Sequence, residues 1–322
     1  MNKTTTEVYS AFAHDVKEGL SQQPKSLSSK YFYDPIGDLL FQRIMELDEY
    51  YLTRSEFEIF SEQKEKILKA FLGNEESFRL VELGAGDGTK TKVLLDHFVE
   101  RGIIFTYSPI DISGHVLKSL ESELNTLLPA LKVESVQGDY FKALKELKRS
   151  NCQKEVVLFL GSNIGNFIGY SGKVFLKQLG KSLMPGDLLF IGFDLMKDPQ
   201  TILSAYNDKH GITAEFNLNL LDRINNELGG NFERDAFTHF PTYDPLTGET
   251  KSFLISKRRQ SVYIESIDYS FEFQTNEAIH MEVSQKYSFQ MIEEFADYAG
   301  FEIVQNFTDR KDFFVDSLWV KR

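Results

Sequence analysis

Cysteine is almost absent from this 322-residue sequence, in which Cys152 is the only one. An internal disulfide bond is therefore excluded, and the chain suits a reducing compartment. Long apolar segments are also lacking, because no stretch reaches the length of a membrane span and residues 1–20 have no apolar core of signal-peptide length. We therefore expect a soluble, cytoplasmic protein.

Basic residues are too few to balance the acidic ones. The chain has 36 lysines and arginines against 48 aspartates and glutamates, a net charge of −12, and it has no basic cluster. Binding to nucleic acid or to an anionic membrane depends on positive patches, so neither partner is expected. A metal site is not expected either, since there is no cysteine pair and no ligand spacing among His14, His97, His115, His210, His239 and His280.

The most informative stretch that is present is FRLVELGAGDGTKT, at residues 78–91. An apolar strand ends in a turn containing Gly84, Gly86 and Gly88, and a helix is expected to begin near Thr89. Glycine permits a sharp turn and close approach of a ligand, while the N–H groups of the helix N-terminus face that ligand. The Glu-x-Gly-x-Gly-x-Gly spacing resembles the first motif of S-adenosylmethionine (SAM) methyltransferases. The alternative is a glycine turn that merely closes a βα unit.

Strands and helices alternate after this turn. Strands are predicted at 103–112, 132–140, 155–161 and 187–195, with helices at 89–100, 115–127, 141–148 and 171–183. This rhythm indicates an α/β fold with a mostly parallel sheet covered on both faces. A helix at 289–300, with Gly300 as its C-cap, precedes two directly joined strands. Such strands form an antiparallel pair, as in the Rossmann-like sheet of SAM methyltransferases.

The remaining segments predict a second, smaller α+β substrate domain. Residues 1–60 are helical and aromatic, and a helix at 61–72 leads into the glycine strand. Residues 198–283 hold one helix, at 213–230, followed by β-rich sequence with a hairpin turn at Asp244–Gly248. We therefore expect residues 61–197 and 284–322 to form the SAM-binding domain, and residues 1–60 and 198–283 to form the substrate domain.

Several polar residues follow the predicted strands, where ligands of such sheets bind. Asp111 could hold a ribose diol, although a helix N-terminal acid is the alternative. Asp139 and Tyr140 could contact and stack on an adenine, unless they form a plain loop. In GSNIGNF, at 161–167, Asn166 offers both a donor and an acceptor, which suits an amine and a carboxylate on one substrate.

Seven separated motifs together resemble the histidine Nα-methyltransferases, which form hercynine on the route to ergothioneine. They are YFYD, EYYLTR, VELGAGDGTKT, YSPIDIS, GDYF, GSNIGN and IHMEVSQKYS, in the order of that family. The resemblance implies SAM as cofactor and histidine as substrate. The alternatives are methylation of another amino acid such as tryptophan, or an inert SAM-binding protein. We expect a monomer that acts on a small molecule.

The resemblance also implies roles for individual residues. Tyr33 and Asn166 are the expected catalytic residues, with Tyr33 assisting loss of the amine proton. The expected substrate-binding residues are Tyr50, Gly161, Asn166, Tyr206, Glu282 and Ser284, of which Glu282 and Ser284 read the imidazole. The expected cofactor-binding residues are Gly84, Gly86, Lys90, Asp111, Asp139 and Tyr140. Ordinary core packing is the alternative for both tyrosines, Tyr33 and Tyr50. Departures from the family at Ser252 and Val283 leave the shape of the side-chain pocket open, whereas the departure at Asp87-Gly88, in the glycine turn, is expected to leave cofactor binding intact.

Overall fold

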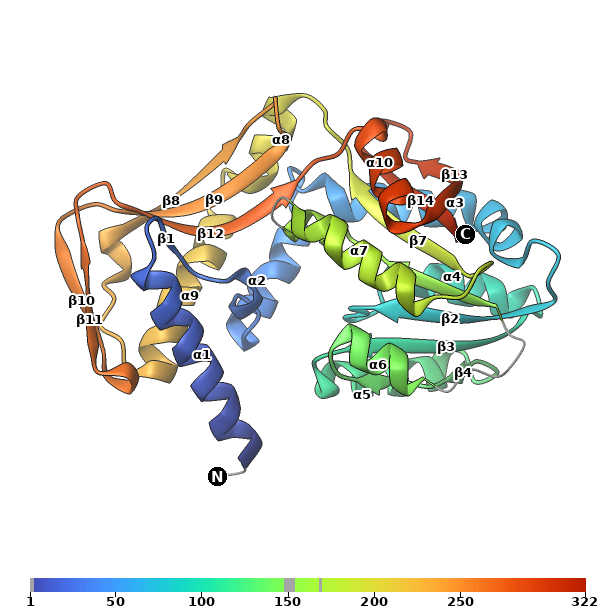
Figure 1. The fold of residues 1–322 in the computed structure, drawn as a ribbon, viewed down its shortest axis with the longest axis horizontal. Coiled ribbons are helices and arrows are strands. Elements are labelled where there is room, and N and C mark those ends of the chain that lie inside the picture. The colour runs from blue at the N-terminus through green and yellow to red at the C-terminus, as the bar shows by residue number, and fades with distance from the viewer. Residues whose placement is uncertain (1–2, 148–153, 168–169) are drawn as a thin grey trace. The chain divides into compact units, whose positions relative to one another are not determined.

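The computed structural model describes residues 3–147, 154–167 and 170–322 (Figure 1). Cys152 and the end of the helix predicted at 141–148 lie outside these residues. The chain divides into two compact units. The first unit comprises residues 1–51 and 197–284, and the second comprises residues 52–196 and 285–322.

The second unit is built on an eight-stranded sheet (Figure 1). Its strand order is β13-β14-β7-β6-β2-β3-β4, and β5 also pairs with β3. All pairings are parallel except those of β14, which is antiparallel to both β7 and β13. The predicted Rossmann-like sheet is thus confirmed. Its strands are β2 (Ser77–Leu83), β3 (Ile104–Asp111), β4 (Lys132–Val133), β5 (Val136–Gln137), β6 (Glu155–Phe159), β7 (Leu188–Asp194), β13 (Phe301–Thr308) and β14 (Phe314–Lys321).

Helices cover both faces of this sheet because its central strands are apolar on both sides. In β6, Val156 and Leu158 pack into one core, and Val157 and Phe159 pack into the other. The first core includes α3 (Tyr51–Leu72), α4 (Thr91–Glu100) and α5 (Gly114–Leu127). The second includes α6 (Tyr140–Glu146), α7 (Tyr170–Ser182) and α10 (Phe289–Ala299). The predicted start of the helix at 61–72 is wrong, because α3 runs without a break from Tyr51 to Leu72.

The first unit is α+β. Its sheet has the order β1-β12-β9-β8, and β10 and β11 form a separate hairpin. The predicted hairpin around Asp244–Gly248 is confirmed by the antiparallel pairing of β8 with β9. The strands are β1 (Lys25–Ser26), β8 (Phe237–Tyr243), β9 (Glu249–Ser256), β10 (Gln260–Ile264), β11 (Tyr269–Phe273) and β12 (Ala278–Gln285). The helices are α1 (Lys3–Ser21), α2 (Pro35–Met45), α8 (Pro199–Tyr206) and α9 (Ile212–Leu228), with short 3-10 turns at Ser29–Tyr31, Arg234–Ala236 and Glu265–Ile267.

Residues 198–283 contain two helices, so the prediction of one helix was wrong. The additional helix, α8, begins with Pro199 directly after Asp198, whose side chain accepts a hydrogen bond from the Thr201 N–H at 2.8 Å. Both residues are typical of a helix N-terminus. Because α8 has only 8 residues, its apolar positions do not repeat often enough to form a clear helical period.

Asp34 joins two helices of the first unit, α2 and α9. Its carboxylate accepts hydrogen bonds from the Gly37 N–H at 2.7 Å and from the Asn219 side chain at 2.8 Å. The first bond caps α2, and the second ties α2 to α9. A Cβ at Gly37 would lie 1.8 Å from the Phe32 carbonyl oxygen, so only glycine fits there. This arrangement fixes the backbone on either side of Tyr33.

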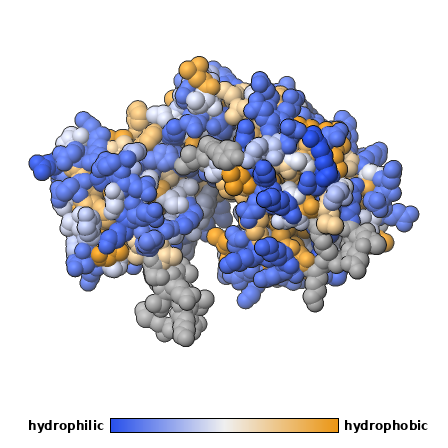
Figure 2. All heavy atoms as spheres, viewed as in Figure 1, coloured by the Kyte–Doolittle hydropathy of each residue, from blue (hydrophilic) through white to orange (hydrophobic). Residues whose placement is uncertain are grey.

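The face shown in Figure 2 is mainly hydrophilic, with smaller apolar areas between polar residues. Apolar side chains instead form three buried clusters, two of them in the second unit and one in the first. Among the residues described, no helix is long and apolar enough to cross a membrane.

Candidate active site

The glycine turn has the backbone geometry that its sequence predicts. Gly84, Gly86 and Gly88 all have positive φ angles, of 74°, 54° and 66°. A Cβ at Gly86 would meet no atom within 4 Å, so open space lies beside the backbone there. A Cβ at Gly84 would lie 2.8 Å from the Tyr140 hydroxyl. The turn therefore has room for a ligand at Gly86 and is covered by Tyr140 at Gly84.

Asp111 connects the end of β3 to this turn. One carboxylate oxygen accepts a hydrogen bond from the Gly86 N–H at 3.2 Å, and the other accepts from the Ser113 N–H at 2.9 Å. Ser113, not Asp111, caps α5 through its own hydroxyl. Each carboxylate oxygen has further acceptor capacity, and Asp111 is only partly buried. This geometry leaves Asp111 able to accept hydrogen bonds from a diol.

Tyr140 lies close to both neighbouring acids. Burial raises the pKa of its hydroxyl to about 12, and the negative charges of Asp111 and Asp139 contribute. Asp139 caps α6, since its carboxylate accepts hydrogen bonds from the N–H groups of Phe141 at 3.1 Å and Lys142 at 3.3 Å. Asp139 therefore has a local structural role, whatever ligand it contacts.

Lys90, at the N-cap of α4, forms an ion pair with Glu56 of α3. Burial lowers the pKa of Lys90, but the negative charge and hydrogen bond of Glu56, together with the charges of Asp316 and Glu82, outweigh this effect and raise the pKa above its usual range. Glu56 is fully buried and also accepts a hydrogen bond from the Gly161 N–H at 2.7 Å. Glu56 thus links two predicted ligand-binding residues that come from different loops. Sequence reasoning missed it, because a glutamate within a helix usually lies on the surface.

The loop after β6 is fixed by hydrogen bonds to its backbone and side chains. Ser162 has a positive φ of 57°, and its hydroxyl accepts a hydrogen bond from the Asp194 N–H at 3.0 Å. The Tyr287 hydroxyl donates to the Ile164 carbonyl oxygen at 3.1 Å. The loop continues as a 3-10 turn, Asn163–Asn166, in which Asn166 is exposed. The amide of Asn166 is therefore carried on a well-anchored turn.

Glu82, the acidic residue of the glycine motif, is buried below the turn. It accepts hydrogen bonds from the Tyr107 hydroxyl at 2.5 Å and the Thr91 hydroxyl at 2.7 Å. Burial raises the pKa of Glu82 to about 7, although the hydroxyl groups and Lys90 favour its charged form. Through Thr91, Glu82 connects β2 to the first turn of α4.

Tyr33 belongs to an aromatic group in the first unit. Its ring makes edge contacts with Phe41 and Phe216 at centroid distances of 5.6 and 5.7 Å, and Phe41 also contacts Tyr50 at 6.2 Å. Tyr33 exposes 46% of its surface. Desolvation of its hydroxyl, followed by the negative charge of Glu282, raises the pKa of Tyr33 above its usual range. The hydroxyl is therefore neutral at physiological pH.

The remaining predicted substrate residues of this unit come from α8 and β12. Tyr206, the last residue of α8, is buried and lies near enough to Tyr33 to affect its pKa. In β12, Glu282 is partly buried and Ser284 is only 6% exposed, so a solvent-facing strand edge does not explain Ser284. Tyr206 and Glu282 thus each lie within electrostatic range of Tyr33.

The predicted site residues are divided between the two units. The first unit contains Tyr33, Tyr50, Tyr206, Glu282 and Ser284. The second contains Gly84, Gly86, Lys90, Asp111, Asp139, Tyr140, Gly161 and Asn166. The second unit thus carries every residue predicted to bind the cofactor, and the first carries most of those predicted to bind the amino acid.

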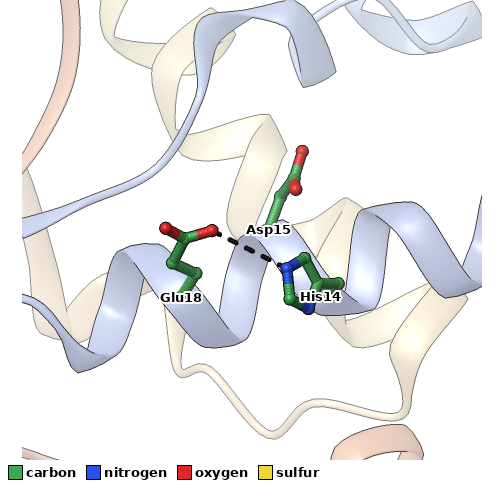
Figure 3. Close-up of side chains that lie close together, drawn as sticks. All are labelled: His14, Asp15 and Glu18. Atoms are coloured by element: carbon green, nitrogen blue, oxygen red, sulfur yellow. Dashed lines mark ion pairs between the residues drawn. The ribbon is translucent and has the colours of Figure 1, made fainter.

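One group of potential metal ligands lies on α1 (Figure 3). Potential ligand atoms of His14, Asp15 and Glu18 lie within 4.8 Å of one another. Asp15 already accepts a hydrogen bond from Tyr31 at 2.8 Å and pairs with the Lys30 ammonium at 2.5 Å. Because that ammonium would repel a metal ion, and because His14 and Glu18 are exposed, we do not assign a metal site here.

Comparison with known proteins gives one consistent family. Residues 12–321 match the family described as histidine-specific, SAM-dependent methyltransferases. The chain is 35% identical over 311 residues to the histidine N-alpha-methyltransferase of Mycobacterium tuberculosis, covering 97% of this chain and 95% of that protein. It is 35% identical over 277 residues to the enzyme of that name from Mycolicibacterium smegmatis, covering 86% and 84%. It is 30% identical over 298 residues to ergothioneine biosynthesis protein 1 of Schizosaccharomyces pombe, covering 90% of this chain and 38% of that protein.

These matches confirm the resemblance carried by the seven motifs, and they span nearly the whole chain. The glycine turn leaves open space at Gly86 and carries the Asp111 carboxylate beside it. The chain belongs to the family of histidine-specific, SAM-dependent methyltransferases.

Proposed function

We propose that this protein methylates the α-amine of L-histidine with SAM and carries the reaction to the trimethyl betaine, hercynine. The family match supports the reaction. The structural observation that carries the choice of substrate is the partly buried carboxylate of Glu282, which lies in the same unit as the aromatic group of Tyr33 and within electrostatic range of Tyr33. A carboxylate in an aromatic surrounding suits an imidazole, which is flat and presents an N–H donor.

The second unit holds the cofactor in this proposal. Gly86 admits it to the backbone, Asp111 holds its ribose, Tyr140 packs on its adenine and Lys90 attracts its carboxylate. When bound, SAM supplies an electrophilic methyl group on a sulfonium ion. Methyl transfer is an in-line displacement, so the protein contributes mainly by positioning the amine.

The amine must be neutral to act as the nucleophile. Tyr33 is itself neutral, because its pKa is raised far above the usual range, so its hydroxyl oxygen can accept a hydrogen bond from the amine. Asn166 supplies a donor for the substrate carboxylate and an acceptor for the amine. After methylation, the aromatic rings around Tyr33 accommodate the cationic product by cation–π attraction.

The test is incubation of the purified protein with SAM and an equimolar mixture of amino acids, followed by mass spectrometry. The proposal expects one substrate, histidine, with mono-, di- and trimethyl forms appearing in sequence. A tryptophan product would favour the alternative substrate. Tight SAM binding without methylation of any amino acid would instead indicate an inert SAM-binding protein.

A further inference from the structure

Asp316, in β14, is a buried acid to which the proposed reaction gives no role. It is fully buried, and neither carboxylate oxygen has a hydrogen-bond partner among residues 3–147, 154–167 and 170–322. An ionised carboxylate in such a place would be strongly destabilising, since nothing replaces the water it has lost. Two charged groups affect the pKa of Asp316: Glu56 raises it and Lys90 lowers it.

A carboxyl group that meets no donor is stable in its neutral form, because it can then donate its own proton. Burial raises the pKa of Asp316 well above its usual range, and the negative charge of Glu56 raises it further. Asp316 pairs with Gly192 in the register of β14 and β7, and a Cβ at Gly192 would lie 2.8 Å from a carboxylate oxygen of Glu56, so the two acids lie side by side. Since Glu56 also pairs with Lys90 and accepts from the Gly161 N–H, Glu56 is the ionised member of the two.

The other titratable groups around this cluster agree with that assignment. The negative charges of Glu56, Asp316 and Glu82 all raise the pKa of Lys90. Glu82 in turn accepts a hydrogen bond from the Tyr107 hydroxyl. With all three acids ionised, one lysine would face three buried negative charges. A proton on Asp316 removes one of these charges and leaves the Glu56–Lys90 pair intact.

We propose that Asp316 and Glu56 form a buried acid–carboxylate pair that positions Lys90 and Gly161 for SAM binding. The inference rests on the proposed function, because SAM is the ligand that Lys90 and the loop at Gly161 would contact. Asp316 donates to Glu56 and fixes its orientation, and Glu56 then joins the start of α4 to the loop after β6. Gly192, on β7, leaves the space that Glu56 occupies, since a Cβ there would lie 2.8 Å from a Glu56 oxygen.

Two substitutions of Asp316 test the pair. Asp316→Asn has the shape of the neutral acid and can still donate to Glu56, so its Kd for SAM stays near that of the wild type. Asp316→Leu cannot donate, and its Kd and KM for SAM rise about tenfold or more, as expected for loss of a hydrogen bond to a charged group. The KM for histidine stays unchanged in both variants, which a general loss of structure would not produce.

Two results would overturn the proposal. Equal loss of SAM affinity in Asp316→Asn and Asp316→Leu, or failure of Asp316→Asn to fold, would mean that ionised Asp316 is required. Wild-type SAM affinity in Asp316→Leu would mean that Asp316 positions nothing. Glu56→Gln gives the reference for a broken Lys90 pair, with a larger rise in the Kd for SAM than Asp316→Leu.

Infrared spectroscopy of the ligand-free protein keeps the test independent of activity. The wild type is expected to show the carbonyl stretching band of a protonated carboxylic acid, and Asp316→Asn is expected to lack this band. Absence of the band from the wild type would overturn the proposed pair. If the wild type methylates no amino acid, the proposed function fails, but this band still decides whether Asp316 carries the proton.

Discussion

Gly86 and Gly102 have similar left-handed backbones, with φ angles of 54° and 70°, and a Cβ at either position would meet no atom within 4 Å. Only Gly86 lies in the turn assigned to SAM. Alanine at each position should cost about 1 to 2 kcal/mol of stability through backbone strain. Gly86→Ala should also weaken SAM binding, measured by calorimetry, whereas Gly102→Ala should not. Equal SAM affinities in the two variants would contradict the assignment of this turn.

Asp111→Ala should weaken SAM binding by about 2 to 4 kcal/mol, because charge-assisted hydrogen bonds to the ribose are lost. The substitution also removes the acceptor of the Gly86 N–H, which donates a hydrogen bond to Asp111 in the wild type. Asp87→Ala is the matched control, since Asp87 is an exposed acid of the same turn and contacts only the local Thr89 N–H. Titration calorimetry showing unchanged affinity in Asp111→Ala would remove Asp111 from the site.

Tyr33→Phe should lower kcat more than it raises the KM for histidine. The wild-type rate should rise with pH as the substrate amine, with a pKa of roughly 9 in a free amino acid and near 8 in peptides, loses its proton. Because the pKa of Tyr33 is raised well above its usual range, Tyr33 does not titrate there, and the variant should keep the same rise. Tyr269→Phe is the control, as both tyrosines are 46% exposed. If the pH dependence vanished in Tyr33→Phe, Tyr33 would itself be the titrating group.

Glu282→Ala should reduce the preference for histidine over apolar aromatic amino acids. The wild type rejects tryptophan because a carboxylate without its N–H partner is left unpaired, at a cost of roughly 1 to 3 kcal/mol. The control is Glu272→Ala, which removes an exposed acid from the same unit. Competition assays with histidine and tryptophan measure the preference, and an unchanged ratio in Glu282→Ala would mean that Glu282 does not read the imidazole.

Glu82 should make stability depend on pH. Its pKa is raised from 4.5 to about 7 in the folded protein, so the folded state binds the proton more tightly than the unfolded state. This contribution is fully present below pH 4.5 and is lost as the pH rises to about 7. Relative to Glu82→Gln, the wild type should therefore lose about 3 kcal/mol of unfolding free energy over this range. Parallel pH profiles from urea denaturation would contradict the shift.

Local patterns predicted the glycine turn and most of the large sheet. The spacing of Gly84, Gly86 and Gly88 determines the turn by itself, and the alternation of strands and helices determines a parallel sheet. The strand predicted at 132–140 was wrong, because only two short pieces, β4 and β5, pair with β3. Between them, Glu134 forms an ion pair with Arg79 of β2 at 3.0 Å, and Ser135 donates a hydrogen bond to Glu121 of α5 at 2.8 Å.

The burial of the two acids, Glu56 and Asp316, could not be predicted from the sequence. Glu56 looks like a surface residue of α3, and Asp316 interrupts an apolar strand without any local sign of its environment. Their burial depends on β14 lying beside β7, where Gly192 leaves space for Glu56. Only the assembled sheet brings together these residues, which are distant in the sequence. The roles assigned to the predicted site residues stay predictions until the variants above are measured.

The first unit is built from two separate segments of the chain, residues 1–51 and 197–284, and this has a consequence for its synthesis on the ribosome. Lys25 pairs with Glu277 at 2.5 Å, 252 residues further along the chain, and β1 takes its place only beside β12. The amino-terminal segment therefore leaves the ribosome long before its partner strand exists. Contacts between residues that are so far apart in the sequence form slowly during folding. We expect the nascent chain to depend on chaperones until residue 284 has emerged, and ribosome-bound chains shorter than this should remain sensitive to protease in residues 1–51.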